Sequence, residues 1–220
     1  MTDTRIMLAG GTLFDLADPA ASEFTIGDIA HALGRVCRFA GHTNRFYSVA
    51  EHCVHVARLV PLSLMRPALL HDASEAFIGD VTRPLKAMLP DYREIEARVE
   101  DAISDRLLAD HAPEDVDANP AYQRAAARRQ LIHDPTIKLA DTAMCLVEAR
   151  ELMPTLPGYW NLRTDPEMLA RARNVRMNFD KPEFAAALWL RAWHRAGHWL
   201  EQHQTQQAAD DTTQPEQVAA

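Results

Sequence analysis

Apolar residues recur at every third or fourth position along most of the chain, which is the spacing of one face of an α-helix. This pattern predicts helices over 25–36, 49–60, 67–80, 92–108, 124–131, 135–149 and 183–200. Two of the helix starts are capping-box sequences: Thr25 with Asp28, and Ser48 with Glu51. The stretches 81–86 and 109–119 combine proline with polar residues and predict loops. The fold class expected from this pattern is all-α.

The start of the chain departs from the helical spacing. Two short apolar runs, 6–8 and 12–16, flank Ala9, Gly10 and Gly11. A glycine pair supplies the positive φ that a tight turn requires. We therefore expect a small N-terminal β-hairpin.

A length of 220 residues suits one domain with a sizeable core. We expect this domain to cover 1–200, with its core at about 25–155 and C-terminal helices to 200. Residues 201–220 are mostly Gln, Ala, Thr and Asp, which predicts a disordered tail. The aromatic stripe of the last helix predicts either core packing or a subunit contact, and leaves a homodimer open.

Charge and cysteine content narrow the class of protein. A net charge of −8 argues against binding to a nucleic acid polymer. Cys37, Cys53 and Cys145 are odd in number and far apart, which fits a reducing compartment. Residues 1–5 lead into no apolar signal segment, and no stretch approaches the roughly 18 apolar residues of a membrane span. We expect a cytoplasmic protein without membrane contact.

Segment 67–80 places polar groups inside an apolar pattern. His71 and Asp72 are adjacent, and Glu75 follows four and three residues later, on the edge that both share in a helix. A buried carboxylate is costly unless it is paired or binds a metal, so a cation is expected nearby. A histidine–aspartate pair that only forms a hydrogen bond in a helical core is the simpler alternative.

His52 and Asp141 repeat this pattern on other predicted helices. A core histidine, and a carboxylate paired with Lys138, are the simpler explanations when each is taken alone. Together with His71 and Asp72 they make two imidazoles and two carboxylates. Mixed nitrogen and oxygen ligands suit one divalent ion such as Mn²⁺, Co²⁺, Fe²⁺, Ni²⁺ or Zn²⁺ better than Mg²⁺ or Ca²⁺.

The loop 38–47 is rich in cations and aromatic rings, including Arg38, Phe39, His42 and Arg45. Arginine binds phosphate with two parallel hydrogen bonds, and aromatic rings stack on bases. The loop is therefore either a solvated surface or a place that holds a phosphate and a base.

The order His, His-Asp, Asp resembles the HD-domain metal-dependent phosphohydrolases. The motifs 48–52 and 71–80 are similar to those of the HD-domain 5′-deoxynucleotidases, and more closely to a bacterial and phage-borne branch that shares Asp28-Ile29-Ala30-His31-Ala32-Leu33 and Arg38-Phe39-Ala40-Gly41-His42-Thr43. This resemblance spans about 10–155 and implies the HD-domain helical bundle.

The resemblance also implies roles for individual residues. One divalent metal would be held by His52, His71, Asp72 and Asp141. Glu75 would be the catalytic acidic residue and Asp80 a second acidic residue near the phosphate and sugar. Arg38 would bind phosphate, and Phe39 stands where the family has a Trp that helps reject a 2′-hydroxyl. His42, Arg45 and Lys86 are further candidate phosphate contacts.

The implied activity is hydrolysis of a (deoxy)nucleoside 5′-monophosphate to nucleoside and phosphate. A triphosphohydrolase acting on deoxynucleoside triphosphates is the nearest alternative. A nucleotide-binding regulator without turnover, and a metal-free helical interaction protein, are alternatives of other classes. For the nucleotidase, the triphosphohydrolase and the regulator, the expected partner is a small nucleotide.

Overall fold

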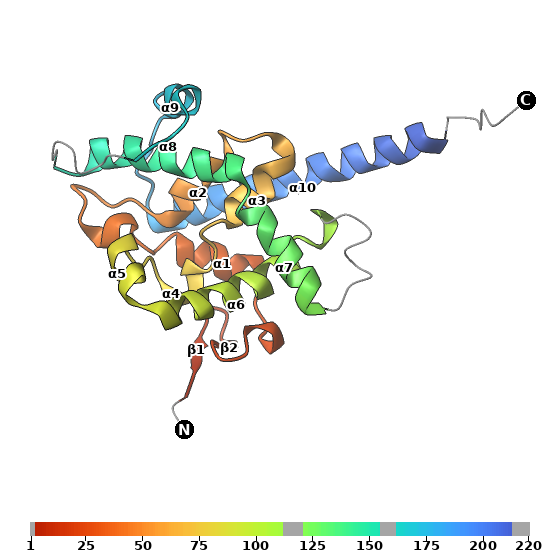
Figure 1. Cartoon of the computed structure of the whole chain (residues 1–220), viewed down its shortest axis with the longest axis horizontal. Helices are drawn as coiled ribbons and strands as arrows, with labels where there is room; N and C mark the ends of the chain where they lie inside the picture. The colour runs from red at the N-terminus through yellow and green to blue at the C-terminus, as the bar shows by residue number, and fades with distance from the viewer. Residues whose placement is uncertain (1–2, 112–120, 155–161, 213–220) are drawn as a thin grey trace, which may run out of the picture.

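The computed structural model describes residues 3–111, 121–154 and 162–212. The chain folds as a bundle of α-helices, which confirms the all-α prediction (Figure 1). The helices are α1 (Ile26–Leu33), α2 (Val49–Ala57), α3 (Met65–Leu70), α4 (Glu75–Ile78), α5 (Arg83–Met88), α6 (Pro90–Leu107), α7 (Ala121–Ile132), α8 (Pro135–Leu152), α9 (Pro166–Ala172) and α10 (Pro182–Thr212). Short 3₁₀ turns include η2 (Arg38–Gly41).

The expected N-terminal hairpin is present and is fastened to the bundle. Strands β1 (Arg5–Met7) and β2 (Leu13–Asp15) pair antiparallel, with Ile6 opposite Phe14. Gly11 adopts a φ of 88° in the turn, as the glycine pair predicted. Phe14 is fully buried and stacks on Phe77 of α4, with ring centroids 4.0 Å apart. The hairpin therefore covers α4.

Helix α2 runs through the middle of the bundle, and all nine of its residues are buried. It packs against α3, α8 and α10 (Figure 1). Its polar side chains Glu51, His52 and His55 must find partners inside the protein, because an unpaired buried polar group is costly. His55 Nδ1 lies 3.0 Å from the hydroxyl of Tyr47, and burial lowers the pKa of this imidazole to about 4.

The capping box predicted at Ser48 is half formed. Ser48 Oγ accepts the backbone N–H of Glu51 at 3.2 Å. The Glu51 carboxylate instead accepts the backbone N–H groups of residues 178, 179 and 180, at 2.7, 2.9 and 2.9 Å. Three donors on one loop replace the single donor of the helix start, so tertiary contact overrides the local cap. The Thr25–Asp28 box forms completely.

Helix α10 anchors α3 through its tryptophans. Trp189 is fully buried, stacks on Trp193 at 5.9 Å, and donates its Nε1–H to the carbonyl of Leu69 at 3.2 Å. These two rings pack in the core, and the homodimer stays a prediction. The helix continues to Thr212, and the disordered tail expected over 201–220 stays a prediction. The domain boundaries at 1–200 stay a prediction.

Two further local predictions were wrong. The expected loop 81–86 contains the start of α5, because Pro84 lies in the first turn of a helix, where proline is tolerated. Segment 67–80 is not one helix: α3 ends at Leu70, a turn follows, and α4 begins at Glu75. Of the predicted loop 109–119, residues 109–111 form a 3₁₀ turn and the rest lies outside the described residues.

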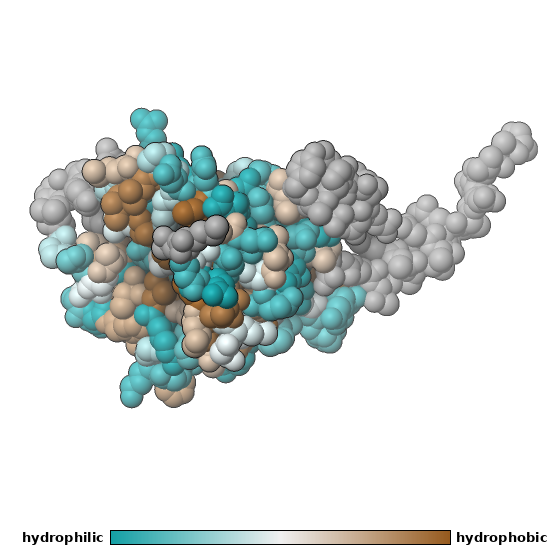
Figure 2. Space-filling model, turned by 90° about the horizontal axis from the view of Figure 1, so that it is seen from below, coloured by the Kyte–Doolittle hydropathy of each residue, from teal (hydrophilic) through white to brown (hydrophobic). Residues whose placement is uncertain are grey.

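In the part of the chain that the structure describes, no helix is both long enough and apolar enough to cross a membrane. Figure 2 shows apolar areas scattered among hydrophilic ones on the lower face. Most of the large exposed apolar side chains belong to the hairpin and to α5 and its end, and the others lie at Leu62, Leu139 and Phe184.

Candidate metal centre

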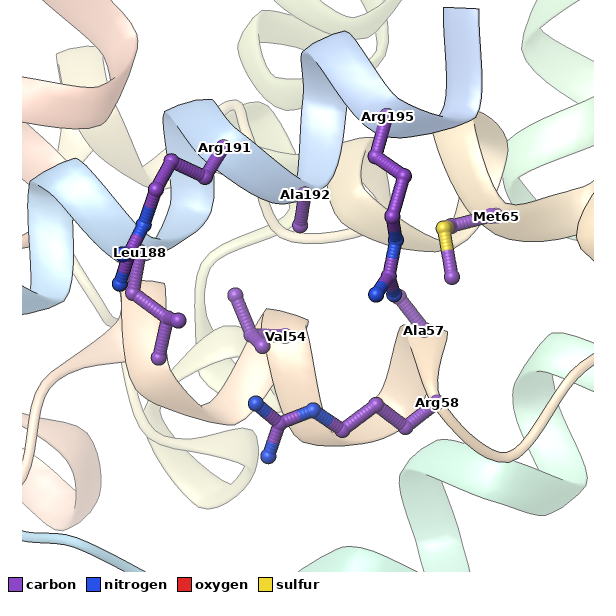
Figure 3. Close-up of a pocket in the computed structure, with 8 residues that line it drawn as sticks. All are labelled: Val54, Ala57, Arg58, Met65, Leu188, Arg191, Ala192 and Arg195. Atoms are coloured by element: carbon purple, nitrogen blue, oxygen red, sulfur yellow. The ribbon is translucent and has the colours of Figure 1, made fainter. Parts of the chain in front are cut away.

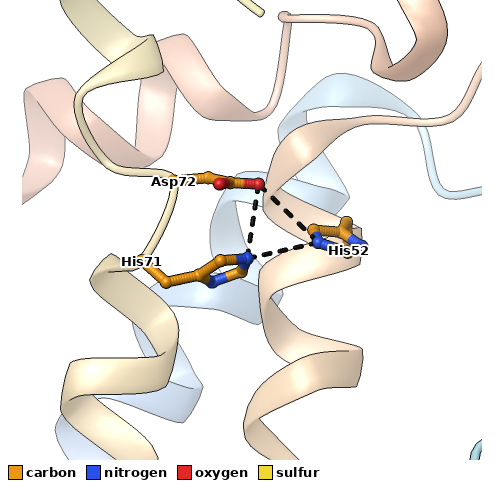
Figure 4. Close-up of side chains that lie close together, drawn as sticks. All are labelled: His52, His71 and Asp72. Carbon is orange, nitrogen blue, oxygen red and sulfur yellow. Dashed lines mark hydrogen bonds and ion pairs between the residues drawn. The ribbon is translucent and has the colours of Figure 1, made fainter. Parts of the chain in front are cut away.

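Two helices and one turn bring four predicted ligands together. His52 comes from α2, His71 and Asp72 from the turn after α3, and Asp141 from α8. His52 Nε2 lies 3.3 Å from His71 Nε2, 3.6 Å from Asp72 Oδ2 and 3.4 Å from Asp141 Oδ1. His71 Nε2 lies 3.3 Å from Asp72 Oδ2 (Figure 4). One ligand atom each of His52, His71 and Asp72 therefore lies within 4.8 Å of the other two, close enough to share one metal ion, and Asp141 approaches this group from the side of His52.

Both imidazoles are held by their other nitrogen. His52 Nδ1 is 2.7 Å from a carboxylate oxygen of Glu148, and His71 Nδ1 is 2.7 Å from the carbonyl oxygen of Ala68. These partners only accept, so each Nδ1 carries a proton. In the neutral form each Nε2 then presents a lone pair to the other imidazole and to the Asp72 carboxylate, and His52 Nε2 also faces Asp141. Such a group of acceptors requires either protons or a cation between them, and its chemistry fits a divalent metal.

The pKa shifts of the two imidazoles and two carboxylates show the same need for positive charge. Burial lowers the pKa of His71, but Asp72 and Cys53 together raise it by more, so this pKa lies well above its usual value. Burial and Arg38 lower the pKa of His52, whereas Glu148 and Asp141 raise it more. Burial raises the pKa of Asp72 and Asp141, but the neighbouring imidazoles hold both below the usual range. Positive charge is therefore strongly favoured at this point.

Asp141 combines the two explanations that the sequence left open. Its Oδ1 faces His52, while its Oδ2 accepts a hydrogen bond from Lys138 Nζ at 2.8 Å. Lys138 is mostly exposed and three residues away on the same helix. The pair with Lys138 exists, and it leaves one carboxylate oxygen directed at the cluster.

Glu148 is the residue that sequence reasoning missed. It is completely buried on α8, accepts hydrogen bonds from His52 at 2.7 Å and from the Tyr47 hydroxyl at 2.8 Å, and lies 3.8 Å from Arg38 Nε. Burial alone would raise the pKa of Glu148. The nearby His52 and Arg38 lower it by more, so the pKa lies below its usual value and the carboxylate stays ionised. Its position seven residues after Asp141, on the same face of a helix, was the available signal.

Glu75 and Asp80 lie beside the cluster without joining it. The Glu75 side chain is 4% exposed, and its Oε2 has no hydrogen-bond partner in the described part of the protein. Burial, then the charges of Asp72 and Asp80, raise the pKa of Glu75 well above the usual value. Burial also raises the pKa of Asp80. A carboxyl group that readily holds a proton therefore stands next to the metal-ligand candidates.

Arg38 is the cation that faces the acidic groups. Its Nη1 donates to Asp72 Oδ2 at 3.3 Å, and Glu148 and Asp72 raise its pKa against the effect of burial. It begins η2, where Phe39 and Ala40 have φ values of 55° and 50°. A non-glycine residue in this region costs about 1–3 kcal/mol. The Arg38 guanidinium lies 5.5 Å from the ring of Phe39, so the turn holds both side chains together.

The remaining predicted phosphate contacts are less central. Lys86 Nζ donates to Glu96 Oε1 at 2.6 Å. Burial lowers the pKa of Lys86, but Glu96 and, to a lesser degree, Glu75 raise it by more. Arg45 stacks on the ring of Phe179 at 4.5 Å. His42 is exposed and contacts Phe39 through its backbone N–H. Contact of these three with a phosphate stays a prediction.

Comparisons with known proteins identify the family of this chain. The sequence profile of the family described as 5′-deoxynucleotidase YfbR-like matches residues 24–153. The uncharacterized protein YfdR of Escherichia coli K12 is 45% identical over 84 residues, which cover 38% of this chain and 47% of YfdR. The uncharacterized protein RCAP_rcc00048 of Rhodobacter capsulatus is 35% identical over 156 residues, which cover 66% of this chain and 71% of that protein. The chain spans about half the length of the first of these relatives. It belongs to the YfbR-like 5′-deoxynucleotidase family of the HD-domain superfamily.

Proposed function

We propose that this protein is a metal-dependent phosphohydrolase that converts (deoxy)nucleoside 5′-monophosphates to nucleoside and phosphate. The observation that carries the proposal is the meeting of two acceptor nitrogens and two carboxylates next to the buried, unpaired oxygen of Glu75. A structural ion pair would not need an additional protonatable carboxyl group beside it. The family match adds the class of reaction.

His52, His71, Asp72 and Asp141 would hold one divalent cation. Bound there, the cation would activate a water molecule and neutralise charge on the phosphoryl oxygens. Glu148 and the Ala68 carbonyl keep each Nε2 free for this role, because they hold the proton on each Nδ1. Mn²⁺, Co²⁺, Fe²⁺, Ni²⁺ and Zn²⁺ fit the mixed ligands better than Mg²⁺.

Glu75 would manage the protons of the reaction. As a water oxygen forms its bond to phosphorus and the bond from phosphorus to the sugar 5′-oxygen breaks, the water loses a proton and the leaving oxygen gains one. Glu75 can take the first and return it to the second, because its raised pKa brings the carboxyl group toward neutral pH. Asp80, which shares its electrostatic environment, would lie on the sugar side.

Arg38 would bind the phosphate. Its guanidinium already faces Asp72, so an incoming phosphoryl group would find a fixed fork of donors at the cluster. Phe39, on the same turn, would face the sugar. Phe39 in place of a Trp leaves the choice between ribose and deoxyribose to experiment.

A substrate panel tests the proposal. Metal-stripped protein is supplied with each divalent ion and given ribo- and deoxynucleoside mono- and triphosphates, and phosphate and triphosphate are measured. We expect phosphate from monophosphates, and no turnover by Asp72→Ala. Release of triphosphate would establish the triphosphohydrolase instead. Bound metal with no product from any nucleotide would refute the nucleotidase and favour the silent regulator.

A further inference from the structure

A second concentration of positive charge lies between α2, α3 and α10. It surrounds a cavity of about 240 Å³ lined by Val54, Ala57, Arg58, Met65, Leu188, Arg191, Ala192 and Arg195. Val54, Ala57 and Arg58 follow His52 by two, five and six positions, so at about 100° per residue they point away from the metal-ligand candidates. The cavity is therefore separate from the candidate metal centre, although α2 contributes to both.

Three arginines meet at this cavity without a partner in the described structure. Figure 3 shows Arg191 and Arg195 reaching down from α10 and Arg58 extending from α2 beneath them. All three are exposed, and no acidic residue lines the cavity. Other arginines do pair with carboxylates: Arg35 with Glu183, Arg106 with Glu23, Arg128 with Asp105 and Arg129 with Asp101. Like charges that converge on one cavity repel, and an anion would relieve that repulsion.

The floor between the arginines is apolar. Val54, Ala57, Met65, Leu188 and Ala192 supply it, and none of these side chains carries a hydrogen-bonding group apart from the weak methionine sulfur. Met65 can adapt its shape to a planar or irregular group. An inorganic anion would use only the arginines. A ligand that uses the whole cavity needs both an anionic part and an apolar body.

We propose that this cavity binds a small phosphorylated molecule with an aromatic or apolar body, of the nucleotide class, at a site distinct from the candidate metal centre. Arginine forks suit phosphate oxygens, and the floor suits a base. The cavity is smaller than the roughly 300–1,000 Å³ of enclosed ligand sites, so part of the ligand stays in solvent. A net charge of −8 disfavours a nucleic acid polymer as the occupant.

Calorimetric titration of the metal-stripped full chain tests this site without turnover. The probes are a β,γ-imido analogue of ATP, inorganic pyrophosphate and adenosine. The analogue should bind more tightly than either fragment. The double variant Arg191→Ala/Arg195→Ala should weaken the analogue by roughly a hundredfold, at about tenfold or more for each lost charged contact. Arg173→Ala removes one exposed arginine elsewhere and should change nothing.

A second variant tests the floor and keeps every charge. Ala192→Phe should fill the cavity and weaken the analogue by roughly tenfold while leaving pyrophosphate unchanged. Circular dichroism of each variant confirms that the fold is kept. The proposal is overturned if the double variant binds the analogue as tightly as the parent does, or if Arg173→Ala loses as much affinity. It is also overturned if Arg191 and Arg195 are needed for binding of RNA or anionic lipid vesicles but not for binding of any small molecule.

Discussion

Glu148→Gln should weaken metal binding while leaving the protein folded. The exchange keeps the volume of a completely buried side chain and removes its charge. The carboxylate now accepts from His52 at 2.7 Å and from Tyr47 at 2.8 Å. Both donors already share Oε1, so a glutamine oxygen could keep these two bonds but without the negative charge. Its NH₂ group would take the place of Oε2 and face Arg38 Nε, which is also a donor. The imidazole then loses a charge-assisted hydrogen bond and part of its basicity.

The expected loss follows from that bond. Hydrogen bonds to an ionised acceptor are about twice as strong as neutral ones, and replacing such an outer partner of a metal-bound histidine typically costs 10- to 100-fold in metal affinity. This corresponds to about 1.4–2.8 kcal/mol. Glu148→Ala should do more, because it leaves Tyr47 and His52 without their shared acceptor and Arg38 without its buried counter-charge, and the free energy of unfolding should fall by about 3–5 kcal/mol.

Competition between the stripped protein and a chelator of known affinity measures the metal constant. Glu151→Gln is the matched control, since Glu151 is exposed on the same helix and should bind metal as the parent does. The stabilisation by a fixed concentration of Mn²⁺, read as a shift in Tm, gives a second measure. If Glu148→Gln binds metal as tightly as the parent and the control, the orienting role assigned to Glu148 is wrong.

Four other changes have definite expected outcomes. Glu75→Gln should keep metal affinity and lower kcat by about 10²- to 10⁴-fold, with metal content and phosphate release as readouts; unchanged kcat would contradict its role. Asp72→Ala should abolish the Mn²⁺-dependent rise in Tm, and a persisting rise would contradict the ligand assignment. In the metal-free protein the pKa of His71 in the folded state is raised above its ordinary 6.5. Protonated His71 therefore stabilises the fold at low pH, and this contribution is lost as the pH rises through the pKa of the folded state. Calorimetry should show that Tm falls as the pH rises through this range, and a Tm that increases with pH would contradict the predicted direction. Trp189→Ala should cost about 3–5 kcal/mol in urea unfolding, whereas a loss under about 1 kcal/mol would place the ring outside the core.

The sequence predicted the helices and the hairpin because these depend on local periodicity and turn chemistry. It also singled out His52, His71 and Asp72, which the structure places close enough to hold one metal ion, since each is a polar group in an apolar setting that requires a partner. The role of Asp141 as a fourth ligand stays a prediction. The break between α3 and α4 was hidden, because no proline or glycine marks it. Adjacent residues in a helix diverge by about 100°, and the turn lets both His71 and Asp72 reach the cluster. Tertiary contacts impose that break.

Glu148 and the true partners of Glu51 were out of reach for a related reason. Each carboxylate meets donors far away in the sequence: His52 and Tyr47 for Glu148, and the loop 178–180 for Glu51. Periodicity tells which side of a helix is buried but not which side chain of another helix meets it there. The capping-box rule even favoured the wrong partner for Glu51, since three backbone donors from the loop win over one local donor.

The contact between Phe14 and Phe77 has a practical consequence for handling this protein. Helix α4 has four residues, too few for a helix to be stable alone. It is held by packing against α1 and by the ring of Phe14 on Phe77, so the position of the Glu75 carboxyl group depends in part on the hairpin, about sixty positions earlier in the chain. An affinity tag or fusion partner that pulls the hairpin away would loosen Glu75 while leaving the metal ligands in place. Preparations that bind metal fully yet turn over slowly would then report where the tag was attached, and a C-terminal tag is the better choice for kinetics.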